Sequence, residues 1–155
     1  MTAQNGIVVG PAEGLAWELE PGRPVTLKLE STETDERVMM FEETAPPGID
    51  TPLHFHRDSD EVMYILSGEV MFKIGDEVAV GGPGTCAFMP RLVAHAWKSI
   101  GPKPARLLTL YTPAAAGKLF EELAGLSGGG SGEDRRVPAG IVERHDLEIV
   151  GPSPF

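Results

Sequence analysis

The chain has 155 residues and a formal net charge of −10, with 19 glycines, 14 prolines and a single cysteine, Cys86. Its length fits one domain, residues 1–155, and its excess of carboxylates argues against nucleic acid and anionic membranes as partners, because both are bound through Lys and Arg. The lone cysteine excludes an internal disulfide, and because the sequence shows neither a membrane-spanning apolar run nor a secretory signal pattern, we expect a cytoplasmic location.

Short apolar stretches separated by Gly and Pro predict a series of strands over about residues 20–113. Residues 25–29 alternate between apolar and polar side chains, as a half-buried strand does. Ser67-Gly68 predicts a hairpin-type break between two strands, 61–66 and 69–74. The further predicted strands are 37–43, 78–80, 86–89, 94–98 and 106–111. Many short strands at this spacing indicate an antiparallel sandwich or barrel.

The pattern changes after Pro113. Residues 114–126 carry an apolar stripe that predicts a short amphipathic helix. Residues 127–136 are rich in Gly and Ser and indicate a flexible linker. Residues 137–155 hold too few apolar side chains to form a core, so we expect this tail to dock on the barrel or on a neighbouring subunit.

Two of the four histidines, His54 and His56, stand one residue apart, so a strand would direct both to the same face. A polar loop then leads to Glu61, and a hairpin or tight connection there would return its carboxylate to the two imidazoles. His95, at the start of a later strand, is a fourth candidate. Three imidazoles and one carboxylate suit one divalent first-row metal such as Fe, Ni, Mn, Cu or Zn. The alternative for His54, His56 and Glu61 is a solvated polar turn.

The residues of this region resemble the two motifs of the cupin superfamily. The first motif, from Gly48 to Gly68, reads Gly-IDTPL-His-Phe-His-RDSD-Glu-VMYILS-Gly. The second is matched by Gly84, Pro90 and His95, whereas Leu92 replaces a glycine and Ser99 replaces an asparagine. These departures affect a turn and a polar contact and leave the four ligand positions intact.

The resemblance implies an all-β fold, an antiparallel jelly-roll β-barrel with a short C-terminal helix and tail. It also implies that His54, His56, Glu61 and His95 bind a metal inside the barrel. The layout is similar to small single-domain bacterial cupins described as quercetinase-like dioxygenases. We therefore expect a metal-dependent dioxygenase acting on a small enolic or phenolic compound. The alternatives are a metal-dependent isomerase, lyase or decarboxylase, and a non-catalytic small-molecule-binding protein.

Within this hypothesis, Glu61 is the ligand that can also accept a proton from the substrate. Met63 and Trp97 are expected to line an apolar substrate pocket, with Met40 as a further candidate. Ile65 and Phe88 are interpreted as core residues, and Cys86 as a small buried side chain outside the site. Small cupins commonly pair through their outer sheets, so we expect a homodimer with residues 25–29 or the tail at the interface.

Overall fold

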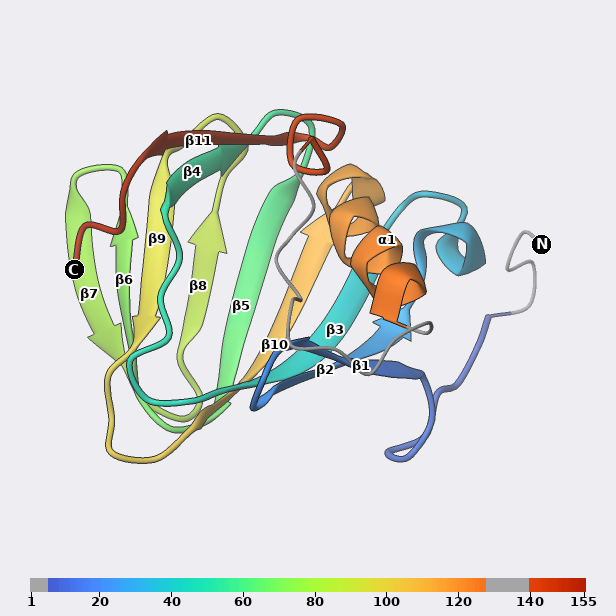
Figure 1. Cartoon of the computed structure of the whole chain (residues 1–155), viewed down its shortest axis with the longest axis horizontal. Coiled ribbons are helices and arrows are strands. Elements are labelled where there is room, and N and C mark those ends of the chain that lie inside the picture. The colour runs from blue at the N-terminus through green and yellow to red at the C-terminus, as the bar shows by residue number, and fades with distance from the viewer. Residues whose placement is uncertain (1–5, 128–139) are drawn as a thin grey trace.

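The structure is a computed structural model that describes residues 6–127 and 140–155, and its strands form two antiparallel sheets (Figure 1). Within these residues, one sheet has six strands, in the order β1 (Leu15–Glu20), β2 (Arg23–Leu29), β3 (Met39–Ala45), β10 (Ala105–Thr112), β5 (Asp60–Ser67) and β8 (Cys86–Met89). The other has five, in the order β11 (Leu147–Gly151), β4 (Leu53–His56), β9 (His95–Ser99), β6 (Val70–Ile74) and β7 (Glu77–Gly81). The expected all-β, jelly-roll class is confirmed.

The inward faces of the two sheets form an apolar interior that is divided into two clusters. One cluster joins residues of both sheets and includes Ile65, Phe72 and Trp97. The other lies between β1, β2, β3 and the C-terminal helix and includes Phe41 and Tyr111. Each strand contributes every second residue, as the alternating burial of β3 shows. Residues of both clusters line the cavity described below.

The predicted C-terminal helix is present in two parts. The 3-10 helix η2 (Ala114–Gly117) leads directly into α1 (Lys118–Ser127), which contacts β1. A second 3-10 helix, η1 (Ser31–Thr34), connects β2 and β3. Residues 128–136 of the predicted linker lie outside the described residues, and the described part of the tail includes β11, which pairs with β4. Of the described helices, none has the length and apolar character that a bilayer span requires.

The predicted hairpin at Ser67-Gly68 is wrong. β5 pairs with β10 and β8 in the six-stranded sheet, whereas β6 pairs with β7 and β9 in the other. The chain therefore crosses between the sheets at Gly68, which has a φ of 85°. A Cβ at this position would come within 2.6 Å of the Cα of Ala105, so the crossing requires glycine.

The expected burial of Cys86 and Phe88 is also wrong. Both face outward on β8, and Phe88 is 56 % exposed. Ala87 and Met89 alternate with them and point into the core. A short apolar run does not indicate by itself which of its two faces is buried, and here the smaller and the more flexible side chain point inward.

Candidate metal centre

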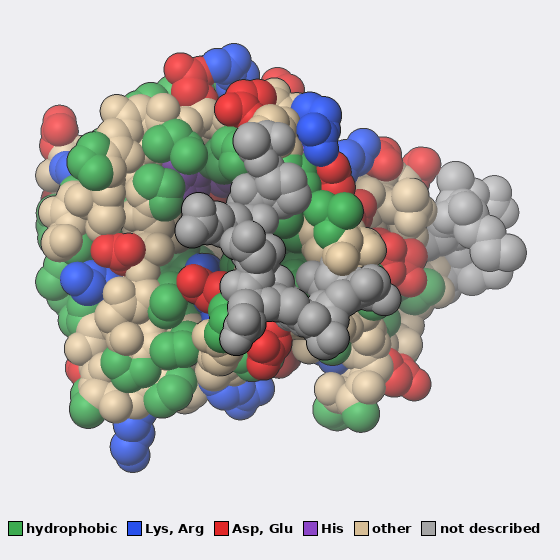
Figure 2. All heavy atoms as spheres, in the orientation of Figure 1, with side chains coloured by type: hydrophobic (Ala, Val, Ile, Leu, Met, Phe, Trp, Pro, Cys, Tyr) green, Lys and Arg blue, Asp and Glu red, His purple; other side chains and the backbone are tan. Residues whose placement is uncertain are grey.

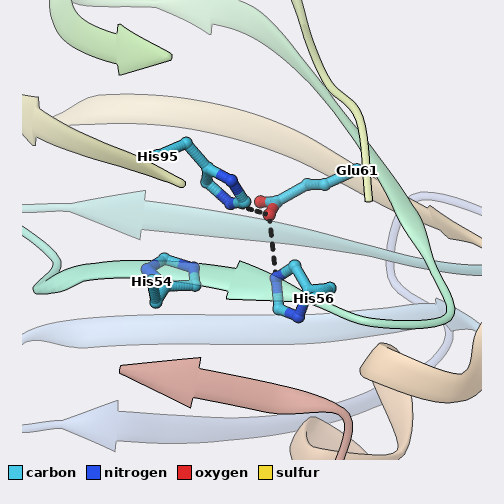
Figure 3. A group of neighbouring side chains, drawn as sticks. All are labelled: His54, His56, Glu61 and His95. Atoms are coloured by element: carbon cyan, nitrogen blue, oxygen red, sulfur yellow. Dashed lines mark hydrogen bonds and ion pairs between the residues drawn. The ribbon is translucent and has the colours of Figure 1, made fainter. Parts of the chain in front are cut away.

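The four predicted metal ligands converge in the interior of the molecule (Figure 3). One donor atom each from His54, His56, Glu61 and His95 lies within 4.8 Å of the other three. All four side chains are buried, from 0 % exposure for His95 to 8 % for His54. Donors that share a first-row metal at about 2.0–2.2 Å lie about 3–4.4 Å apart, so small side-chain movements suffice to bind one ion.

The three histidines come from one sheet, and Glu61 faces them from the other. His54 and His56 are the inward residues of β4, and His54 is the register partner of His95 on β9. Residues 57–59 then carry the chain across to β5, where Glu61 follows the first residue of the strand. The connection is tight but is not a hairpin, because β4 and β5 belong to different sheets.

Backbone carbonyls orient two of the imidazoles. The Nδ1–H of His54 donates to the carbonyl of Pro52 at 2.8 Å, and the Nδ1–H of His95 donates to that of Val93 at 2.9 Å. In each case the acceptor lies two residues before the histidine. These hydrogen bonds leave the Nε2 atoms directed to the centre, which is how metal-binding histidines are commonly held.

The Glu61 carboxylate is the anionic centre of the group. Its Oε2 accepts hydrogen bonds from the Nε2 of His56 at 3.2 Å and from that of His95 at 3.1 Å. Burial alone would raise the pKa of Glu61, but the hydrogen bonds and charges of the two histidines outweigh it and hold that pKa below its usual range. For His95, burial acts to lower the pKa, but the contact with Glu61 prevails and raises it.

His54 is suited to bind a metal as a neutral imidazole, and His56 carries an unpaired ring nitrogen. Burial and the neighbouring His95 lower the pKa of His54 to about 4, so it is uncharged near neutral pH. The Nδ1 of His56 is buried and has no hydrogen-bond partner among the described residues. Buried polar atoms are rarely left unpaired without a functional reason. The donor set of three imidazoles and one carboxylate therefore fits a divalent first-row metal.

A cavity of about 590 Å³ adjoins the histidines, and Figure 2 shows histidine atoms recessed among hydrophobic side chains. His54, His56 and Glu61 form part of its wall. Its apolar walls come from both sheets, α1 and the tail, and include Phe41, Trp97, Phe120, Val142, Leu147 and Ile149. A cavity of this size and composition is typical of a site for a small apolar molecule.

Of the three predicted pocket residues, Trp97 lies in the cavity wall. Met63 is buried on the same face of β5 as Glu61, but it packs in the core cluster beside Ile65. Met40 points to the opposite face of β3 from Phe41, and it is Phe41 that reaches the cavity. Among the described residues of the wall, neither Met40 nor Met63 is present, so the structure does not place these two in a pocket.

Several polar residues of the wall were not predicted from the sequence, among them Arg23, Glu43 and Tyr111. Arg23 on β2 binds Glu43 on β3, with 2.7 Å between the guanidinium Nε and a carboxylate oxygen; Glu43 is buried and the Arg23 side chain is 11 % exposed. Tyr111 on β10 donates a hydrogen bond to Glu61, and burial raises the pKa of its phenol well above the usual value. The signal for Glu43 was available, since it alternates with Phe41 and Ala45 on the inward face of its strand.

The structure shows the local setting of both residues that depart from the second motif, Leu92 and Ser99. Leu92 has a φ of 66°, the left-handed conformation that favours the glycine found there in the motif. Its N–H donates to the carbonyl of His56 at 2.8 Å, so the turn supports a ligand strand. Ser99 is buried, and its hydroxyl donates to the carbonyl of Ala45 at 3.3 Å. The ligands themselves are unaffected by either replacement.

Comparisons with known proteins agree with this architecture. The family model described as "Cupin domain" matches residues 41–111. Solved structures with a similar fold include KdgF from Halomonas sp., with 18% identity, coverage of 70% of this chain and 94% of that chain, and a TM-score of 0.61. A predicted oxalate decarboxylase from Thermotoga maritima has 20% identity, coverage of 68% and 98%, and a TM-score of 0.61. An RmlC-like cupin from Shewanella frigidimarina has 18% identity, coverage of 73% and 96%, and a TM-score of 0.60.

At these identities, the likeness to the solved structures establishes the fold alone. A search of curated proteins found no match.

Proposed function

Because the chain belongs to the cupin superfamily, we propose that it is a metal-dependent enzyme, most specifically a dioxygenase of a small enolic or phenolic compound. The observation that carries the proposal is the position of the buried three-histidine, one-glutamate group in the wall of a largely apolar cavity. Such an arrangement exposes the ligand group to a small molecule while the surrounding side chains exclude water.

The lining of the cavity supports an uncharged, ring-containing substrate. Aromatic side chains from three elements, Phe41, Trp97 and Phe120, offer flat apolar surfaces. The guanidinium of Arg23 is already engaged by Glu43 and Glu20, so it does not offer the free positive charge that a phosphorylated substrate would need. An aromatic or otherwise unsaturated hydroxy compound fits these walls better than a sugar phosphate.

A bound divalent metal would supply a Lewis acid for a substrate oxygen and a centre for the reaction with molecular oxygen. Glu61 is the ligand side chain whose carboxylate oxygens can accept the proton of a substrate hydroxyl. Tyr111 remains protonated, and its hydrogen bond holds the carboxylate in place. His54 and His95 are fixed by the carbonyls of Pro52 and Val93 and so keep their Nε2 atoms aimed at the centre.

The proposal is tested by oxygen uptake. Metal-free protein is loaded in separate samples with Fe(II), Ni(II), Mn(II), Cu(II) and Zn(II), and each is given flavonols, catechols and enolised diketones under air. With at least one redox-active metal, we expect oxygen to be consumed in proportion to the product formed. We expect this consumption to be lost in Glu61→Gln.

Two results would replace the proposal by its alternatives. Product formation without oxygen consumption would indicate an isomerase, lyase or decarboxylase, which the same ligand group can serve. Tight ligand binding by metal-free protein, without turnover in any metal-loaded sample, would indicate a non-catalytic binding protein. Both results contradict the dioxygenase function.

A further inference from the structure

The cavity wall also carries Arg23, Glu43 and Thr109, which we together call the distal polar cluster. Its residues come from β2, β3 and β10 of the six-stranded sheet. Glu43 binds the guanidinium of Arg23, whose central carbon lies 5.3 Å from the centre of the Trp97 ring. A mostly buried ion pair in a largely apolar wall is an expensive arrangement for stability alone. Its position therefore points to a function within the cavity.

Thr109 is the part of this cluster that lacks a partner. The residue is 1 % exposed, and its hydroxyl oxygen finds no hydrogen-bond partner among the described residues. It lies on the inward face of β10, between Leu107 and Tyr111. An unpaired buried hydroxyl destabilises a protein relative to an apolar side chain of the same shape. A ligand that contacts this oxygen would satisfy it.

The spacing along β10 sets the size of such a ligand. Tyr111 hydrogen-bonds Glu61 at the metal centre, and Thr109 lies two residues away on the same face, which is about 7 Å along a strand. Two fused aromatic rings span about this distance. A molecule that reaches from the metal centre to Thr109 thus carries polar groups at both ends and an apolar body between the aromatic walls.

The charges around the cluster define which polar group it accepts. Arg23 is bound by two carboxylates, those of Glu43 and Glu20, and Glu20 also lines the cavity. Burial is the main cause of the raised pKa of Glu43, and the negative charge of Glu61 adds to it. A carboxylate or phosphate on the ligand would be repelled here, whereas a neutral hydroxyl can both donate to and accept from its neighbours.

We propose that the distal polar cluster of Arg23, Glu43 and Thr109 binds a second, uncharged hydroxyl group of the substrate, on the side of the ring system remote from the metal centre. The substrate class is then a compact aromatic compound with hydroxyl groups at opposite ends. Thr109 distinguishes substrates that carry this hydroxyl from those that lack it, and the Arg23–Glu43 pair positions the hydroxyl. This inference rests on the proposed function, which places the first hydroxyl group of the substrate at the metal.

The test compares the binding of three probes to Zn(II)-loaded protein. Zinc is not redox-active, so the probes bind without being oxidised. The probes are 2-naphthol, 2,6-dihydroxynaphthalene and 6-hydroxy-2-naphthoic acid. The binding of each is measured by calorimetric titration. We expect wild type to bind the diol about tenfold more tightly than 2-naphthol, the amount that one well-formed hydrogen bond can supply. The naphthoic acid is expected to bind more weakly than the diol. Elemental analysis confirms equal zinc content in all samples.

Two matched variants assign the preference to Thr109. Thr109→Val has the same shape without the hydroxyl, and we expect it to bind both naphthols equally with unchanged affinity for 2-naphthol. Thr109→Ser restores the hydroxyl and is expected to restore the preference. Glu43→Gln, which keeps a hydrogen bond to Arg23, provides a second variant and is expected to reduce the preference several-fold.

Three outcomes would overturn the inference: no binding of either naphthol, equal binding of both by wild type, and a diol preference that survives in Thr109→Val. Tighter binding of the naphthoic acid than of the diol would overturn it as well. A diol preference that depends on Thr109, together with no oxygen consumption under any condition, leaves the distal polar cluster in place and contradicts the dioxygenase function alone.

Discussion

The imidazole of His95 and the carboxylate of Glu61 face each other from opposite sheets, with 3.1 Å between Nε2 and Oε2. His95 has its other ring nitrogen engaged by the carbonyl of Val93. In metal-free protein, this imidazole therefore carries a proton on each nitrogen when it pairs with ionised Glu61, in agreement with its raised pKa. The same Nε2 must lose its proton to bind a metal.

Metal binding is therefore expected to release a proton at pH 6.5, the ordinary pKa of a histidine, because His95 is still mostly protonated there. Calorimetric titration of metal-free protein with Zn(II) in two buffers of different ionisation enthalpy measures the number of protons. His95→Gln should release fewer protons on binding zinc. Enthalpies that are the same in both buffers would contradict the His95–Glu61 pairing.

Removing one ligand should remove the metal without unfolding the protein. We expect His56→Ala to be purified with background metal content, because it deletes one of the four converging donors. His145→Ala is the matched control, since His145 pairs with Glu122 outside the group and should leave metal content unchanged. Elemental analysis and circular dichroism measure the two properties, and full occupancy in His56→Ala would refute its assignment as a ligand.

His54 should make metal-free protein less stable in mild acid. Its pKa is about 4 when folded and 6.5 ordinarily, so between these values the unfolded chain binds more protons. The free energy of unfolding therefore falls as the pH decreases from 6.5 to about 4, by up to about 3 kcal/mol from this residue. Urea unfolding across this range, compared with His54→Gln, isolates the contribution. Parallel curves for the two proteins would contradict the lowered pKa.

Leu92→Gly is expected to stabilise the protein by about 1 kcal/mol, because it removes the strain of a left-handed leucine and restores the motif residue. The greater freedom of glycine in the unfolded chain offsets part of the gain. Little burial is lost, since Leu92 is 65 % exposed. Leu92→Ala retains the Cβ and should not gain stability to the same extent. Thermal unfolding of both variants distinguishes strain from side-chain size.

The homodimer remains a proposal, and the strand order makes it more specific. β2, which contains residues 25–29, lies between β1 and β3, so the unpaired edge on this side is β1. We expect light scattering to give twice the chain mass of 16.6 kDa.

Three variants locate the dimer interface. Leu15→Glu should produce monomers if β1 forms it, and Val150→Glu should do so if the tail does. Val8→Glu, at an exposed residue outside both strands, is the control and should remain dimeric. A monomeric wild type would refute the dimer.

The pair His54 and His56 could be predicted because it depends on a local rule, whereas Glu61 and His95 were assigned through the motif resemblance. Alternation along β4 places His54 and His56 on one face whichever sheet the strand joins. The partner of each strand depends on long-range pairing that periodicity does not report. The hairpin expected at Gly68 failed for this reason, and so did the burial expected for Phe88. β1 was not predicted, although Leu15, Trp17 and Leu19 alternate with polar or small residues.

The substrate cavity was harder to predict than the metal centre. Its walls are assembled from residues distant in sequence, such as Arg23, Trp97 and Ile149, which only the fold brings together. Met40 was proposed in place of its neighbour Phe41 because either face of β3 was possible from the sequence. An inward-facing glutamate such as Glu43 would have been a useful signal, since charged side chains are seldom buried without a partner.

The pairing of β11 with β4 has a consequence for any shortened version of this chain. Leu147 and Ile149 are the register partners of His56 and His54, so the last strand covers the backbone of the strand that carries two ligands. A protein truncated after α1 would leave β4 with β9 as its remaining neighbour and expose a row of unsatisfied N–H and C=O groups. Such an edge attracts strands from other molecules, so truncation is expected to show first as aggregation.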